Sequence, residues 1–160
     1  MFIMFDVTTR VQPGFTVAAL AHRGPYAEIG DGFRRLGELM GRAGLLNIIE
    51  NTVGFYYDDP TATPPAELRS HAGATLKAGV AVPDGAERIE VAESEIAVVT
   101  VKGPYSQIAA AWKTIYGDFL PSSGREIGDR PPYERYLNEP MVTAEADLLT
   151  EICVPLKPLG

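Results

Sequence analysis

Thiols, histidines and long apolar runs are scarce in this sequence of 160 residues. The single cysteine, Cys153, excludes an internal disulfide and is typical of a protein of the reducing cytoplasm. Two histidines and one thiol form no zinc-binding pattern, and no phosphate loop or dinucleotide-binding motif is found, so we expect neither metal nor cofactor. No apolar run approaches the roughly 18 residues of a membrane-spanning helix. The segment Met1–Asp6 also lacks the basic start of a signal peptide.

An excess of basic residues is missing as well. The formal net charge is −7, which does not favour non-specific binding to nucleic acid, because that requires a basic surface. A negative protein instead attracts cations. The length is that of one domain, which typically has about 100–200 residues. We therefore expect one domain over residues 1–160, with no direct nucleic-acid or membrane partner.

One segment occurs twice in the chain. Residues 17–36 match residues 96–115 at an offset of 79, so that Gly-Pro-Tyr at 24–26 recurs at 103–105 and Phe33 corresponds to Trp112. Residues 60–76 then match residues 140–156 at an offset of 80. A self-match at constant spacing indicates a duplicated structural unit. We predict two halves, about 1–82 and 83–160, related by a pseudo-two-fold axis with a ligand cleft at their seam.

The hydrophobic pattern predicts the same order of elements in both halves. Apolar positions spaced as in a helix follow each Gly-Pro-Tyr, which predicts helices from residue 26 to about 40 and over 106–119. Runs rich in β-formers predict strands at 2–11, 15–22, 51–57, 68–82, 86–91, 96–102, 133–137 and 147–155. The predicted fold is α+β: a tandem β-α-β-β unit with antiparallel sheet and two main helices.

Glu134 is the most promising functional residue. In a strand over 133–137, Glu134 and Tyr136 share one face. The offset of 79 places Phe55 and Tyr57 at the corresponding positions of the first half, and Trp112 lies on the second helix. A carboxylate among these aromatic rings suits a lipophilic cation, because each ring adds a cation–π attraction of about 0.5–2 kcal/mol. Desolvation of the carboxylate would also allow it to act as a general acid or base.

Each of these residues also has a purely structural interpretation. Glu134 could lie on a solvated edge strand and pair with Arg135 or Arg130, and Trp112 could simply pack in the core. Because Gly-Pro-Tyr occurs in both halves, we expect Tyr26 and Tyr105 to have a structural role at the start of a helix.

Two further residue types look reactive but are more typical of structural positions. Asp58 and Asp59 precede a proline, which favours a solvated turn over a metal site. Cys153 lies in an apolar strand, where a free thiol is usually buried and inert.

An ordered set of motifs resembles the GyrI-like small-molecule-binding family, which includes gyrase-inhibitor-type proteins and effector domains of AraC-type and MerR-type multidrug regulators. The motifs are His22-x-Gly-Pro-Tyr26, Gly54-Phe-Tyr-Tyr-Asp-Asp-Pro60, Gly103-x-Tyr105, Ala111-Trp112, Leu120-Pro-x-Ser-Gly124, Tyr133-Glu-x-Tyr-Leu-Asn138 and Glu151-Ile-x-Val-Pro-Leu156.

The resemblance implies a tandem β-α-β-β fold, in which the glutamate matching Glu134 receives lipophilic cations among aromatic side chains. We therefore expect a standalone binding protein for hydrophobic, cationic compounds, acting by sequestration or sensing in drug resistance. Its ligand-binding residues would be Phe55, Tyr57, Trp112, Glu134 and Tyr136. Many members of the family have an aromatic residue where this chain has Cys153. The smaller side chain implies that one wall of the ligand cleft is more open here than in those members.

The resemblance leaves two other functions open. Some standalone members hydrolyse cyclopropane-bearing DNA-alkylating compounds. If this chain does the same, Glu134 would be the acid or base and Tyr57 and Tyr136 would stabilise the developing oxyanion. The gyrase-inhibitor-type members instead imply an effector module that acts on a separate regulator or on gyrase.

Overall fold

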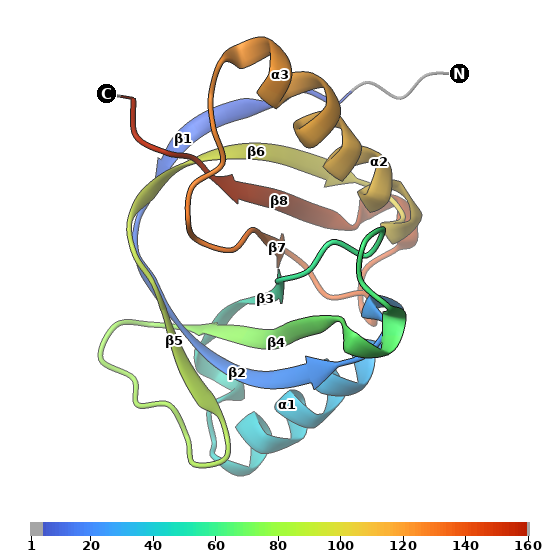
Figure 1. Cartoon of the computed structure of the whole chain (residues 1–160). Helices are drawn as coiled ribbons and strands as arrows, with labels where there is room; N and C mark the ends of the chain where they lie inside the picture. The colour runs from blue at the N-terminus through green and yellow to red at the C-terminus, as the bar shows by residue number, and fades with distance from the viewer. Residues whose placement is uncertain (1–4, 160) are drawn as a thin grey trace. The chain divides into compact units, whose positions relative to one another are not determined.

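The computed structural model describes residues 5–159, which form two compact units (Figure 1). Of the described residues, unit 1 contains 5–13 and 93–159, and unit 2 contains 14–92. The start of the first predicted strand, residues 2–4, lies outside the described residues. Within residues 5–159, no helix has the length and apolar character needed to cross a membrane.

Unit 2 is an antiparallel sheet with one long helix on it. Its strands are β2 (Phe15–Arg23), β3 (Ile49–Tyr56), β4 (Arg69–Leu76) and β5 (Glu87–Val91), in the spatial order β3-β4-β2-β5. Helix α1 (Gly30–Arg42) packs on β2 and β4 (Figure 1). Short 3-10 helices lie at Tyr26–Glu28, Leu46–Ile48 and Pro65–Glu67. The apolar spacing places Leu36 and Met40 on the sheet side of α1, where both are buried with Ala74 and Leu76.

Unit 1 has the same two-layer construction. Its strands are β1 (Thr8–Gln12), β6 (Ser94–Lys102), β7 (Tyr133–Tyr136) and β8 (Leu149–Pro155), in the antiparallel order β1-β6-β8-β7. Short 3-10 helices lie at Tyr105–Gln107 and Glu145–Asp147. Helix α2 (Ile108–Lys113) packs on β6 and β8. Ala111 of α2, and Ile115 just after its end, are buried in one cluster with Val99 and Ile152.

The second main helix departs from the regular helix predicted over 106–119. After Lys113 it widens into a π-helical segment, Thr114–Phe119, and it ends as α3 (Leu120–Ser123) (Figure 1). A π-helical turn accommodates more residues per turn than an α-helix and is frequent at functional sites. The widened segment begins two residues after Trp112, which places this irregularity next to a predicted ligand-binding side chain.

The Gly-Pro-Tyr segments join a strand to a helix in both units. Gly24 and Gly103 have φ angles of 126° and 124°, which residues with a Cβ rarely adopt. Their N–H groups donate hydrogen bonds of 2.8 Å to the carbonyl oxygens of Leu68 and Leu148. The proline that follows cannot continue a strand ladder, so a 3-10 turn leads into the helix.

The α+β class with antiparallel strands and two main helices is confirmed. The units do not follow the predicted halves 1–82 and 83–160, because β1 pairs with β6 and β5 pairs with β2. Each unit therefore takes its outermost strand from the other half of the sequence. The tandem duplication and its pseudo-two-fold axis stay predictions.

Candidate functional site

Glu134 lies on the helix-facing side of the unit 1 sheet. Strand β7 pairs Glu134 with Ile152 of β8, and Ile152 belongs to the core beneath α2. Only 8% of the Glu134 residue is exposed. The alternative of a solvated Glu134 paired with arginine is therefore wrong: Arg135 lies on the opposite face of β7, and Arg130 donates to the carbonyl oxygen of Glu93.

Two aromatic side chains hold the carboxylate of Glu134. The indole Nε1–H of Trp112 donates to Oε2 and the hydroxyl of Tyr136 donates to Oε1, both at 2.7 Å. These donors are neutral, so the hydrogen bonds fix the carboxylate without cancelling its charge. The three residues come from α2 and β7, and the structure brings them together as the sequence predicts.

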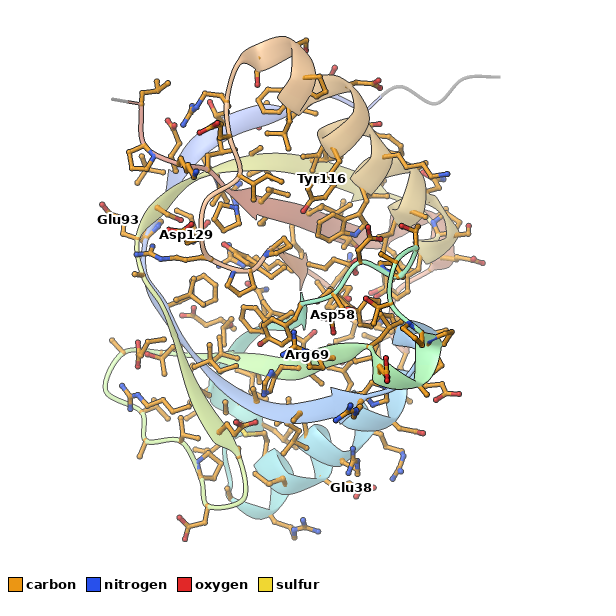
Figure 2. The ribbon with its side chains drawn as sticks, in the orientation of Figure 1. Glu38, Asp58, Arg69, Glu93, Tyr116 and Asp129 are labelled. Carbon is orange, nitrogen blue, oxygen red and sulfur yellow. The ribbon has the colours of Figure 1, made fainter. Side chains whose placement is uncertain are left out.

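Two further tyrosines extend the aromatic surface around this carboxylate. The ring of Tyr116, which is labelled in Figure 2, stacks on Trp112 with centroids 5.8 Å apart and planes at 10°. Tyr105 lies beside Tyr136, with centroids 5.8 Å apart and planes at 57°. Tyr105 and Tyr116 are 37% and 38% exposed, so aromatic faces are accessible to a ligand. The sequence analysis missed Tyr116, although its position four residues after Trp112 places both on one helix face.

Burial changes the protonation of this site. It raises the pKa of the Glu134 carboxyl, and the hydrogen bonds from Tyr136 and Trp112 oppose that rise only in part. Burial also raises the pKa of Tyr105, and the negative charge of Glu134 adds to this rise. The pKa of Tyr116 is raised by burial alone. The phenols of Tyr105 and Tyr116 therefore stay protonated near neutral pH.

Trp112 combines the two roles that the sequence left open. It is half-buried and packs against the unit 1 core, while its N–H reaches Glu134. A buried indole N–H usually needs a hydrogen-bond acceptor, and the carboxylate provides one. Trp112 therefore packs against the core and also joins α2 to β7, and its role as a wall of a ligand site stays a prediction.

The other predicted site residues, Phe55 and Tyr57, belong to unit 2. Phe55 is 1% exposed and lies opposite His71 of β4. The hydroxyl of Tyr57 lies 2.7 Å from His71 Nδ1. That these two residues line the same site as Glu134 stays a prediction.

The sequence comparison aligned β3 and β7 wrongly by one residue. In unit 1, Glu134 pairs with Ile152, and in unit 2 Gly54 pairs with Ala72. The partner strands β4 and β8 match in sequence at an offset of 80, so Ala72 corresponds to Ile152. The residues that pair with these two, Gly54 and Glu134, therefore correspond to each other at the same offset of 80. Gly54, and not Phe55, is thus the positional counterpart of Glu134.

The same shift changes the counterpart of Tyr136. By register it is Tyr56, whose ring lies edge-on to Tyr26 with centroids 4.9 Å apart, and not Tyr57. A shift of one residue moves a side chain to the other face of a sheet. Phe55 and Tyr57 accordingly lie on the face of the unit 2 sheet opposite α1.

The remaining candidates have structural roles. Tyr26 donates to the carbonyl oxygen of Asp58 at 2.9 Å and holds the loop after β3. Asp58 forms a two-pronged ion pair with Arg69 (Figure 2), and Asp59 accepts hydrogen bonds from Thr61. Within residues 5–159, no three His, Cys, Asp or Glu side chains gather as a metal site would require.

Cys153 is buried on the opposite face of the unit 1 sheet, across from Tyr133. Burial raises the pKa of its thiol to about 12. The thiol therefore stays protonated near neutral pH, where only the thiolate is a good nucleophile. The interpretation of Cys153 as a structural residue agrees with this environment.

Comparison with known proteins agrees with this architecture. A protein named DNA gyrase inhibitor from Enterobacter lignolyticus is 30% identical over 87 residues, covering 52% of this chain and 55% of that protein, so the match spans about half its length. The crystal structure of the EcmrR C-terminal domain superposes with a TM-score of 0.81 at 13% identity, covering 98% of this chain and 100% of that one. The structure of SAV2435 bound to tetraphenylphosphonium superposes with a TM-score of 0.67 at 14% identity, covering 97% and 94%.

The model of one family extends over nearly the whole chain. It matches residues 5–157 and therefore includes all the strands and helices described above. The resemblance inferred from the ordered motifs is confirmed: the chain belongs to the family of GyrI-like small molecule binding domains.

Proposed function

We propose that this small-molecule-binding domain takes hydrophobic cations at Glu134 of unit 1, and that it serves to sequester or sense them. The observation that carries the proposal is a buried carboxylate held by Trp112 and Tyr136 at 2.7 Å each. A buried charge is costly unless a partner compensates it. The two hydrogen bonds come from neutral donors, so the negative charge itself stays available to a cationic ligand.

The surrounding rings favour the same class of ligand. Tyr105 and Tyr116 add partly exposed aromatic faces to Trp112 and Tyr136. A cation over such a face gains about 0.5–2 kcal/mol, more when water is excluded. The net charge of −7 also attracts cations from solution. The structural neighbour SAV2435 is known in a complex with tetraphenylphosphonium, which supports the use of this cation as a probe.

The hydrolase alternative has less support than binding. A carboxylate that acts as a general base needs a lone pair directed at water in reach of the substrate. In Glu134 each oxygen already accepts one hydrogen bond, from Trp112 or from Tyr136, so only the second lone pair of each oxygen is left to accept a proton from water. An effector role, in which the domain acts on a separate protein, is supported only by the name DNA gyrase inhibitor of related proteins.

Tetraphenylphosphonium and tetraphenylborate test the proposal, because they have nearly the same shape and opposite charge. We expect the phosphonium to quench the fluorescence of Trp112, the only tryptophan of the chain, and to saturate. The borate should bind at least about tenfold more weakly, since reversing the ligand charge turns attraction to Glu134 into repulsion. Equal affinities for the two ions would show that shape and not charge governs binding.

Binding of tetraphenylphosphonium should also depend on pH. The pKa of Glu134 is raised by burial, so the carboxyl becomes neutral at a higher pH than an ordinary glutamic acid. Affinity should therefore be highest above this raised pKa and fall as the pH decreases through it. The phosphonium cannot itself titrate, so any change belongs to the protein.

Calorimetry in two buffers of different ionisation enthalpy measures the linked proton. Below the raised pKa of Glu134, binding of the cation should release up to about one proton. The Glu134→Gln variant should release none and show a flat pH profile. A profile that persists unchanged in this variant would assign the pH dependence to another group.

A further inference from the structure

Unit 2 contains a pocket that is lined by none of Trp112, Glu134 and Tyr136. Its volume is about 450 Å³, within the range of small-molecule sites. It lies at one end of the strand pair β2–β4, on the sheet face opposite α1, where Ala21 pairs with His71 and Arg23 pairs with Arg69. Tyr57, which follows β3, closes one side. The small side chain of Ala21 leaves the space beside His71 open.

A chain of hydrogen bonds fixes the hydroxyl of Tyr57 in this pocket. His71 Nε2 lies 2.7 Å from a carboxylate oxygen of Glu87, and His71 Nδ1 lies 2.7 Å from the Tyr57 hydroxyl. The Glu87 carboxylate only accepts, so Nε2 carries the proton. When the ring carries this single proton, Nδ1 accepts the hydrogen of Tyr57. The lone pairs of the Tyr57 oxygen are thereby left to accept a hydrogen bond from a ligand.

The positive charge in the same pocket is unevenly compensated. Arg23 and Arg69 lie opposite each other on paired strands, where like charges repel. Both carboxylate oxygens of Asp58 accept hydrogen bonds from the guanidinium of Arg69. Within residues 5–159 no ion pair or hydrogen bond is formed by the Arg23 side chain, and its charge acts on Asp58 only from a distance, where it helps to lower the pKa of that carboxyl. An anion beside Arg23 would therefore be stabilised by a charge without a direct partner of its own.

We propose that this pocket is a second ligand site, which binds a small organic carboxylate that also carries a hydroxyl group. The carboxylate contacts Arg23, and the ligand hydroxyl donates to the oxygen of Tyr57, which donates in turn to His71. Burial raises the pKa of Tyr57 to about 12, so at neutral pH its phenol keeps the proton that it donates to His71. The two contacts recognise different groups of the ligand and can be tested separately.

Calorimetric titration with para-hydroxybenzoate, benzoate and para-hydroxybenzamide tests both contacts. The first probe has both groups, and the others lack the hydroxyl and the charge respectively. We expect para-hydroxybenzoate to bind at least about tenfold more tightly than either, the scale of one lost hydrogen bond to a charged or fixed partner. Absence of saturable binding of para-hydroxybenzoate up to about 10 mM would overturn the proposal.

Three variants assign the contacts. Tyr57→Phe should lower the affinity for para-hydroxybenzoate to that for benzoate and leave benzoate unchanged. Arg23→Gln should weaken both carboxylates about tenfold, whereas Arg35→Gln on α1 removes the same charge outside the pocket and should change neither.

Ala21→Leu tests the location of the site. Ala21 is exposed, so a larger side chain there should fill the pocket and abolish binding without reducing the temperature of thermal unfolding. Retained affinity for para-hydroxybenzoate in Ala21→Leu, or in Tyr57→Phe and Arg23→Gln, would show that the probe binds elsewhere and would refute the assignment.

Discussion

Replacement of Glu134 by glutamine is expected to weaken the binding of tetraphenylphosphonium by about 1–3 kcal/mol, roughly five- to 150-fold in Kd. Glutamine keeps the length of the side chain and a carbonyl oxygen that can accept from Trp112 or Tyr136. It removes only the charge that attracts the cation. Isothermal titration calorimetry measures the change without relying on the fluorescence of Trp112, whose surroundings differ in the variant.

A matched control is Glu126→Gln, which removes the same charge from an exposed side chain in unit 1. This variant should bind tetraphenylphosphonium within about twofold of the unchanged protein, because exposed charges are screened by salt. If Glu134→Gln and Glu126→Gln lose affinity equally, the loss comes from the change in net charge, and the proposal that Glu134 contacts the cation is wrong.

Thermal unfolding shows whether Glu134→Gln remains folded. The pKa of Glu134 is raised in the folded protein, so the folded state holds this proton more tightly than the unfolded chain. The resulting stability is fully present below the unfolded pKa and is lost as the pH rises through the folded pKa. Above the raised pKa of Glu134 we therefore expect the glutamine variant to be at least as stable as the unchanged protein, which separates lost binding from lost folding.

Gly73→Ala should destabilise the protein by about 1–3 kcal/mol, the usual cost of overpacking a core. Gly73 lies in the centre of β4, with Ala19 of β2 and Val53 of β3 on either side. A Cβ atom at this position would overlap Cγ1 of Val17 and lie 3.1 Å from Cγ2 of Val53. Both valines are fully buried, so neither can move aside without disturbing its own packing.

The melting temperature measures this effect, at about 2–4 °C per kcal/mol for a chain of this size. Gly37→Ala is the control, because the same methyl group there meets no atom within 4 Å and lies on the exposed side of α1. In a helix this change should stabilise by about 0.5–1 kcal/mol. An unchanged melting temperature for Gly73→Ala would mean that β2 and β3 move apart more easily than their packing suggests.

Local patterns determined most of the secondary structure. The spacing of Ile29, Phe33, Leu36 and Met40 predicts α1, because an amphipathic helix must repeat its apolar face every three to four residues. Alternation along residues 133–137 likewise predicts that Glu134 and Tyr136 share a face. Since both signals are properties of neighbouring residues, they can be read without the rest of the chain.

The alignment of the two halves of the sequence was a less reliable prediction than the positions of the helices and strands. The offset of 79 is correct for the Gly-Pro-Tyr segments but wrong for β3, where the strand register requires 80 and pairs Gly54 with Ala72. Phe55 and Tyr57 therefore lie on a different face from the one that the alignment assigned to them. The pattern Gly-Phe-Tyr-Tyr contains aromatic residues at three successive positions, so composition alone does not fix its register.

The sequence by itself determined the α+β class, most of the helices and strands, and the shared face of Glu134 and Tyr136. That Glu134, Trp112 and Tyr136 bind a ligand stays a prediction. Only the tertiary structure decided that β1 pairs with β6 and β5 with β2, that Tyr105 and Tyr116 flank the carboxylate, and that His71 connects Tyr57 to Glu87. The physical reason is the range of the interactions. Periodicity arises from the geometry of adjacent residues, whereas strand partners and hydrogen-bond chains join residues far apart in sequence, and their choice depends on how the whole chain packs.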